Sequence, residues 1–254
     1  IRLSLVGSEM CIRDRYQQVS ANELPQGDCL APAAKTDLRH CSFNGRDMGS
    51  IDLQGAILDG VDFSNAKMSG CNLADTSLRK ADLKWAFLTS CLITDADLTG
   101  ADLFHTTFNG SILSNSQFTG ANMFGTNMNH VIAQEADFTE AYMKDISLEE
   151  SNLNRSKFVG CFMQRAVLIS SQLRDTNFYN AVLTGGALEL ADFTRANMSN
   201  ALLNGASLDF TQFIEARLGN ARFTNAVLRD TNFSNARDVP AHLLLMIEQS
   251  GSLH

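Results

Sequence analysis

Residue types that often carry chemistry are present in this chain, but their positions do not group them into a reactive site. The sequence has 254 residues, with six cysteines and five histidines. A zinc site or a catalytic thiol needs Cys and His at suitable spacing, whereas these histidines are scattered, with His105 and His130 at expected turns. No Gly-rich phosphate loop is present in the sequence. We therefore predict no catalytic residue, no metal and no cofactor, and we expect a protein that is not an enzyme.

The cysteines and aspartates instead occur at fixed positions within a repeating unit of five residues. Four cysteines each stand two residues before a large apolar residue: Cys41, Cys71, Cys91 and Cys161. Many aspartates stand one residue before such a residue, as do Asp82, Asp97, Asp102 and Asp137. A buried thiol in a repeat behaves as a small hydrophobe. We interpret the aspartates as part of the same repeat and not as acid/base pairs.

Apolar residues, all of them large except Ala133, occupy every fifth position from Leu38 to Phe233, and we call these forty positions the centres. They comprise twenty Leu, eleven Phe, seven Met, Ile93 and Ala133. A helix cannot use this period, because five steps advance a side chain by about 140° around the axis. A flat strand cannot use it either, because its period is two. A short extended segment fits if the centre and the residue two before it point inward, the residues flanking the centre point outward, and the fifth residue turns a corner.

The corner position, two residues after each centre, carries turn residues. Gly, Asn or Asp occupies 23 of the 39 corners from Gly45 to Asn235, and these residues tolerate left-handed backbone. If four sides close one coil, the structural period is twenty, and Phe centres recur at that separation six times. The resulting columns are Phe43/Phe63, Phe118/Phe138/Phe158/Phe178 and Phe193/Phe213/Phe233. Ten coils spaced by about 4.8 Å give a rod of roughly 48 Å.

Three units carry a resemblance to a known family: Ala-Asp-Leu-Thr-Gly (96–100), Ala-Asn-Met-Phe-Gly (121–125) and Ala-Leu-Leu-Asn-Gly (201–205). They resemble the consensus of the pentapeptide-repeat proteins of bacteria. The resemblance implies an all-β solenoid, a right-handed quadrilateral parallel β-helix. It implies a structural or protein-interaction scaffold whose partner is another protein. The alternative is a DNA-mimicking modulator of a type II topoisomerase (DNA gyrase), as in the quinolone-resistance branch, although this chain lacks the loops that often interrupt the repeat there.

The sequence divides into four segments. Residues 1–15 resemble translated sequencing-adapter read-through, so we expect a non-native or disordered tail and a missing natural N-terminus. Residues 16–37 form an irregular lead-in that covers the first coil, and residues 38–236 form the repeats. Residues 237–254 are expected to form a capping helix and tail, and in some relatives such helices form dimer contacts. A homodimer through this helix is therefore one alternative.

The capping helix has recognisable start and stop signals. We expect Asp238 as its N-cap with Pro240 in the first turn. Leu243, Leu244 and Ile247 should share the stripe that faces the last coil, and Gly251 should end the helix.

Two cysteine pairs bear on the compartment. The lead-in, with Gly-Asp-Cys at 27–29 and Cys41 before the first repeats, is similar to the lead-ins of exported relatives. That resemblance leaves two alternatives: a Cys29–Cys41 disulfide, which favours the periplasm, or two thiols. Cys71 and Cys91 lie one coil apart, where disulfide geometry is rarely good, so we expect thiols there. The compartment stays open between cytoplasm and periplasm.

The outward residues of one side, taken every twenty residues, form an unusual column. Its members are Asp62, Asp82, Asp102, Asn122, Tyr142, Phe162, Val182, Leu202 and Arg222. Three acids are a candidate DNA-mimicking column: Asp62, Asp82 and Asp102. A candidate partner surface consists of Tyr142, Phe162, Val182, Leu202, Phe104 and Phe124. A second outward apolar stripe consists of Leu92, Ile112 and Ile132. Ladders of like residues also stabilise strand pairing, whereas an exposed apolar area often marks a partner.

The overall charge and hydropathy restrict the partner. The net charge is −8 and the isoelectric point is near 5.1, which argues against a direct nucleic-acid-binding surface. No stretch reaches the roughly 18 apolar residues of a membrane span.

Overall fold

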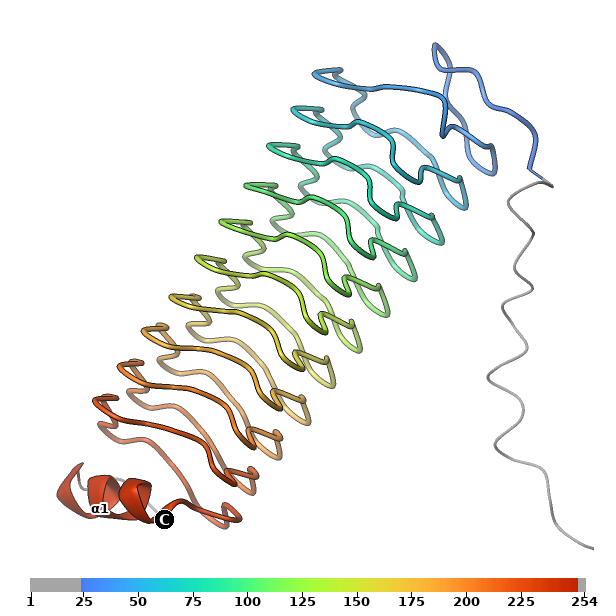
Figure 1. Cartoon of the computed structure of the whole chain (residues 1–254). Coiled ribbons are helices and arrows are strands. Elements are labelled where there is room, and N and C mark those ends of the chain that lie inside the picture. The colour runs from blue at the N-terminus through green and yellow to red at the C-terminus, as the bar shows by residue number, and fades with distance from the viewer. Residues whose placement is uncertain (1–23, 251–254) are drawn as a thin grey trace, which may run out of the picture.

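Each five-residue unit forms one side of a four-sided coil, and successive coils stack into a rod (Figure 1). The computed structural model describes residues 24–250. The prediction for residues 1–15 therefore lies outside the described part. The rod is a right-handed quadrilateral β-helix, which confirms the expected fold class.

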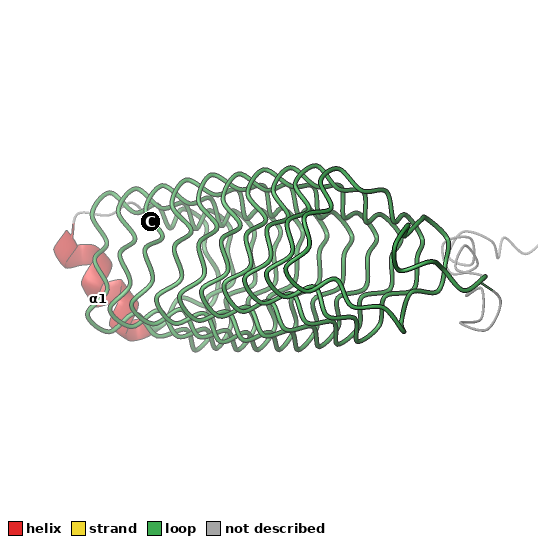
Figure 2. Cartoon of the chain, turned by 90° about the horizontal axis from the view of Figure 1, so that it is seen from above, coloured by secondary structure: helices red, strands yellow, loops and turns green. Residues whose placement is uncertain are grey.

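Adjacent coils are held by parallel pairing at a separation of twenty residues. Asp62 pairs with Asp82, Asp82 with Asp102, and the same register continues to Arg217 with Arg237. The residues at the centres add ladder bonds, as where Phe63 N donates to Asp82 O at 2.7 Å. Each side is too short for a regular strand, so pairing within residues 24–250 consists of isolated bridges and Figure 2 shows no strand.

The corners adopt left-handed backbone, as the sequence predicts. Asn65, Trp85 and Gly100 have φ of 59°, 60° and 66°. At the first coil the positive φ falls on Gly49 instead of Ser50. The fold therefore demands left-handed backbone even where the residue is bulky.

The core is a column of stacked centres. Ring centroids of Phe118 and Phe138 lie 4.9 Å apart, those of Phe138 and Phe158 4.9 Å, and those of Phe158 and Phe178 4.6 Å. All four rings are fully buried, which confirms the predicted column. Most buried hydroxyls two residues before a centre donate to the previous coil, as where Thr106 Oγ1 donates to Leu83 O at 2.7 Å, whereas those of Thr76 and Thr176 donate within their own coil.

The lead-in covers one end of the rod. Gln26 pairs with Asp37 in parallel, and Asp37 N donates to Pro25 O at 2.9 Å. A disulfide joins Cys29 to Cys41, with Cα atoms 5.4 Å apart. The structure thus selects the disulfide from the two alternatives that the sequence left open.

The helix α1 (Ala241–Ser250) covers the other end (Figure 1). Leu243 and Ile247 are buried against the last coil, but Leu244 is 44% exposed, so the three-residue stripe was wrong for Leu244. The N-cap prediction was also wrong. The carbonyl of Pro240 accepts the first helical bonds, and Asp238 has φ of 55°, because the chain turns there to leave the coil.

A second disulfide joins Cys71 to Cys91, whose Cα atoms lie 4.6 Å apart. This corrects the expectation of two thiols, because the stacked inward positions bring these Cα atoms within disulfide range. Cys161 is a buried free thiol, and burial raises its pKa to about 12. Within residues 24–250, no helix is both long and apolar enough to cross a membrane.

Candidate functional site

The outward position just before each centre has a structural task that explains its Asp and Asn residues. Its side-chain oxygen accepts a hydrogen bond from the backbone N–H just after the centre. Asp97 accepts from Thr99 at 2.9 Å, and Asn232 accepts from Ser234 at 2.9 Å. Such Asx bonds stabilise the following turn. An apolar residue at this position cannot accept this bond from the backbone N–H, so the repeat loses one turn-stabilising hydrogen bond there.

Four successive coils lack that hydrogen bond on one side of the rod, because an apolar residue precedes the centre in each of them. Parallel bridges join Tyr142 to Phe162, Phe162 to Val182, and Val182 to Leu202, so the predicted column is formed. Tyr142 is 41% exposed, and the other three are half-buried. Hence these side chains lie outside the core.

Four aromatic rings form one continuous outer stack. Centroids are 5.4 Å apart for Phe104 and Phe124, 6.2 Å for Phe124 and Tyr142, and 5.4 Å for Tyr142 and Phe162. Phe104 and Phe124 each follow a centre in the sequence, whereas Tyr142 and Phe162 each precede one. The stack therefore combines both outward positions of the repeat. We call the combined surface the outer stripe, and it consists of Phe104, Phe124, Tyr142, Phe162, Val182 and Leu202.

Two residues that the sequence analysis did not place in the site extend this stripe at the adjoining corner. The Trp85 and His105 rings stack at 4.4 Å with an interplanar angle of 9°. Phe104 contacts both rings edge-on, at 5.5 Å from Trp85 and 4.4 Å from His105. Trp85 is 50% exposed. The available signal was a Trp at a left-handed corner, where bulky residues are rare.

The next corner along the rod makes room for this pair. A Cβ on Gly125 would lie 2.5 Å from His105 Cε1, and Gly125 has φ of 61°. Glycine therefore both permits the backbone and leaves space for the imidazole. A shallow groove of about 460 Å³ lies beside the ring pair, lined by Asn65, Trp85, Phe87, His105, Thr107, Gly125 and Asn127.

The acidic column lies at the N-terminal end of the same side. Parallel bridges join Asp62, Asp82 and Asp102. Lys84 Nζ lies 2.9 Å from Asp82 Oδ2 and 3.6 Å from Asp102 Oδ2, so one cation partly neutralises two acids. Hydrogen bonds from the Ser64 hydroxyl and backbone hold the pKa of Asp62 below its ordinary value despite partial burial. The column is therefore anionic but not a row of unpaired charges.

Sequence matches identify the repeat. The family description "Pentapeptide repeat region" matches residues 36–118, and "Pentapeptide repeats (8 copies)" matches segments between residues 134 and 237. The chain belongs to the pentapeptide-repeat family. No curated protein sequence matches it at a significant level.

Solved structures of other pentapeptide-repeat proteins share this fold. HetL, involved in heterocyst differentiation regulation in the cyanobacterium Nostoc sp. strain PCC 7120, is 24% identical with a TM-score of 0.67. The match covers 76% of this chain and 90% of HetL. A trypsin-treated variant of QnrB1, a plasmid-mediated fluoroquinolone resistance protein, is 15% identical with a TM-score of 0.63, covering 82% of this chain and 98% of that one. At these identities the likeness establishes the fold alone.

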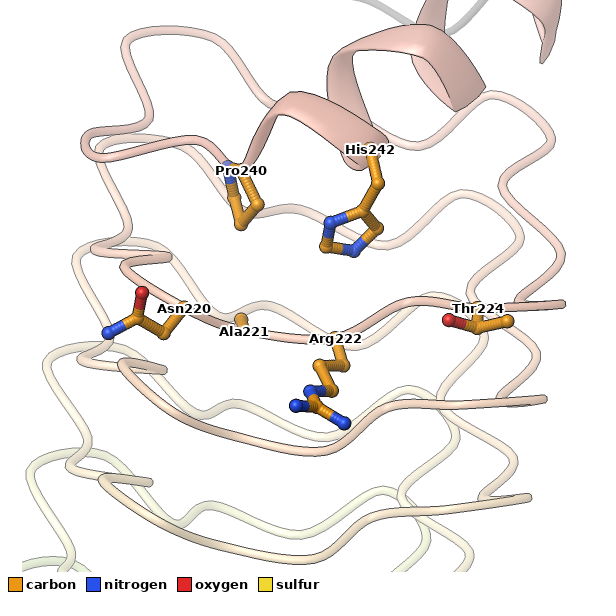
Figure 3. Close-up of a pocket in the computed structure, with 6 residues that line it drawn as sticks. All are labelled: Asn220, Ala221, Arg222, Thr224, Pro240 and His242. Atoms are coloured by element: carbon orange, nitrogen blue, oxygen red, sulfur yellow. The ribbon is translucent and has the colours of Figure 1, made fainter.

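A second hollow of this pentapeptide-repeat protein lies at its C-terminal end (Figure 3). It measures about 500 Å³ and is lined by Asn220, Ala221, Arg222, Thr224, Pro240 and His242. Phe223 N donates to His242 Nε2 at 3.3 Å. In the repeat register, the carbonyl of residue 242 would accept this bond, as Asn232 O does for Phe213 N at 2.7 Å. The imidazole thus replaces a carbonyl of the missing coil, and we assign this hollow to capping.

Among residues 24–250, one Cys/His group is close enough in space for metal binding. Ligand atoms of Cys29, His40 and Cys41 lie within 4.8 Å of one another. The Cys29–Cys41 disulfide engages both sulfurs, and metal ligation by cysteine requires the thiolate. In the disulfide form, the imidazole of His40 is therefore the one side chain of this group that could bind a metal.

The other predicted apolar stripe is also exposed. Leu92, Ile112 and Ile132 are bridged in one column and are 40%, 39% and 43% exposed. They make a second surface on the rod, without aromatic rings, and provide matched controls for the outer stripe.

Proposed function

We propose that this protein is a non-enzymatic scaffold that binds another protein through the outer stripe. The supporting observation is the run of four apolar residues at a position where Asp and Asn are the commonest residues and stabilise the turn. Stacking these residues outside the core costs four Asx bonds, each worth about 1 kcal/mol. Leu92, Ile112 and Ile132 lack the same bond, but the outer stripe adds stacked aromatic rings to that loss, and aromatic anchors dominate many interfaces.

The test compares Phe162→Asp with Ile112→Asp. Both replace an exposed or half-buried outward apolar residue by an acid, but Ile112 lies on the second stripe. Proteins retained by the immobilised wild-type chain from a native extract should be lost with Phe162→Asp and kept with Ile112→Asp. Circular dichroism and thermal unfolding should show both variants folded. Equal retention by all three chains would contradict the proposal.

The alternative function, DNA-mimicking modulation of gyrase, has weaker support. It rests on the anionic column of Asp62, Asp82 and Asp102, but Lys84 pairs with two of these acids. Purified gyrase should therefore supercoil DNA at the same rate with and without micromolar protein. A change in supercoiling that disappears when the three aspartates are changed to asparagine, and survives Phe162→Asp, would favour the alternative.

We propose that the protein acts in an oxidising compartment such as a bacterial periplasm. The support comes from the disulfides Cys29–Cys41 and Cys71–Cys91, since disulfides persist in such compartments. Alkylation followed by mass spectrometry should leave these four cysteines unmodified until a reductant is added. Their full alkylation in denaturant without reductant would contradict this proposal.

A further inference from the structure

We propose that the partner element bound by the outer stripe is an amphipathic α-helix lying along the rod axis, with its N-terminus at the acidic end. This inference rests on the proposed function and specifies the occupant of that surface. Three observations carry it: the spacing of the outer rings, the difference in charge between the two ends, and the length of the stripe between them.

The spacing of the outer rings fits a helix better than a strand. Their centroids are 5.4, 6.2 and 5.4 Å apart, and these separations include a sideways offset of the rings, because parallel coils rise by only about 4.8 Å per step. An α-helix advances about 5.4 Å per turn, about 0.6 Å more than the coil step, so one apolar residue per turn stays close to one ring per coil along the stripe. A strand lying along the axis repeats on one face only every 6.6 Å or so and would lose register.

The charges at the two ends of the stripe complement a helix dipole in one orientation. Asp62, Asp82 and Asp102 precede the stripe, and with Lys84 they leave net negative charge. The exposed residue Arg222 follows it, bridged to Leu202. A helix has partial positive charge at its N-terminus and partial negative charge at its C-terminus. Its N-terminus should therefore lie near Asp102 and its C-terminus near Arg222.

The length of the stripe sets the length of the helix. Six coil steps separate Asp102 from Arg222, or about 29 Å at 4.8 Å per step. At 1.5 Å per residue this accommodates roughly 19 residues. The partner face should carry Leu, Ile or Met at positions i, i+3 or i+4, and i+7. Lys144 Nζ, 5.9 Å from the Phe124 ring centroid, lies beside the path and suits an acidic residue on the helix flank.

The protein contains its own reporter for orientation. Trp85 is the only tryptophan, and it contacts Phe104 at the acidic end of the stripe. The probe is a synthetic tryptophan-free helix of 20 residues with leucines on one stripe and Glu/Lys pairs elsewhere, carrying a fluorescence quencher at either its N- or its C-terminus. A peptide of the same composition in scrambled order, which has no apolar stripe, is the control.

We expect saturable binding of the amphipathic peptide, with strong Trp85 quenching from the N-terminal label and weak quenching from the C-terminal label. Phe162→Asp should weaken binding by about tenfold or more, and Ile112→Asp should leave it unchanged. Equal binding of the scrambled peptide, or binding insensitive to Phe162→Asp, would overturn the inference. Stronger quenching from the C-terminal label would overturn the orientation.

Two further outcomes separate this inference from the proposed function. If no helical peptide binds while Phe162→Asp still abolishes retention of the native partner, the helix is wrong and the scaffold proposal stands. If sedimentation shows that the chain self-associates through Phe162 without peptide, the occupant is a second copy and the helix inference is wrong.

Discussion

Two stacks of aromatic rings run along this rod, one inside and one outside, and the fold requires only the inner one. The inner rings of Phe118, Phe138 and Phe158 occupy centres, are fully buried and lie 4.9 Å apart. The outer rings of Tyr142 and Phe162 lie 5.4 Å apart where the repeat prefers Asp or Asn. Both stacks have nearly parallel rings. The position of a ring within the five-residue unit therefore separates rings that build the rod from rings available to a partner.

The largest expected effect on the free energy of unfolding comes from a substitution that breaks the inner stack. Phe138→Ala should lower the free energy of unfolding by about 3–5 kcal/mol, because it leaves a cavity between two rings that cannot close. Phe162→Ala should cost much less, since its ring is partly hydrated. Urea unfolding of both variants measures the difference. Similar losses would show that the inner and outer assignments are wrong.

A smaller effect is expected at Asp137, the outward neighbour of Phe138. Burial raises the pKa of Asp137, but hydrogen bonds from Thr139 and Lys157 outweigh it, and the folded pKa is lowered. Thr139 N donates to it at 3.0 Å, and Lys157 Nζ lies 3.1 Å away. Asp137→Ala should therefore cost about 1 kcal/mol at pH 7.

The pH dependence of that loss follows from the lowered pKa. The carboxylate stabilises the folded state above the ordinary Asp pKa of about 3.9, and this contribution disappears as the pH falls through the lower folded value. The stability difference between wild type and Asp137→Ala should shrink below about pH 4. A difference that stays constant down to pH 2 would contradict the assignment of the ion pair.

A substitution at the Gly125 corner, beside the outer stack, should change the packing close to that corner. Gly125→Ala places a methyl group against His105 and strains a left-handed corner, so we expect a loss of about 1 kcal/mol. The larger change should be in Trp85 emission, because His105 must move off the indole. Gly205→Ala, at a left-handed corner with no neighbour within 4 Å of the added Cβ, controls for backbone strain. Unchanged Trp85 emission in Gly125→Ala would contradict the stacking of His105 between Trp85 and the Gly125 corner.

The sequence predicted most of the rod because each residue's role depends on its phase in the repeat. The buried column through Phe138 and the outward column through Tyr142 both follow from counting in fives and twenties. The contact between Phe124 and Tyr142 does not follow from counting. These residues occupy different positions in the five-residue unit, and their side-chain rotamers bring the ring centroids to 6.2 Å. The Trp85–His105 pair was missed for a related reason. The sequence pattern assigns the corners to turns, whereas ring stacking between corners depends on side-chain rotamers.

The ends were the least predictable regions. There the repeat stops and single residues decide the geometry. The helix start moved from Asp238 to Pro240 because the departure from the last coil needs a left-handed turn at residue 238. The Cys29–Cys41 disulfide joins the lead-in, which has no repeat, to the first coil, so spacing alone could not choose between thiols and a bond.

The most direct test restores the repeat consensus along the outer stripe. The variant Tyr142→Asn/Phe162→Asn/Val182→Asn/Leu202→Asn should regain four Asx bonds and an amide ladder like that of Asn197 and Asn177, whose side chains lie 3.2 Å apart. If the stripe exists for a partner, the free energy of unfolding should stay within about 1 kcal/mol of wild type or rise. A loss of more than about 2 kcal/mol would show that the outer rings stabilise the rod and would contradict a partner-binding role for the outer stripe.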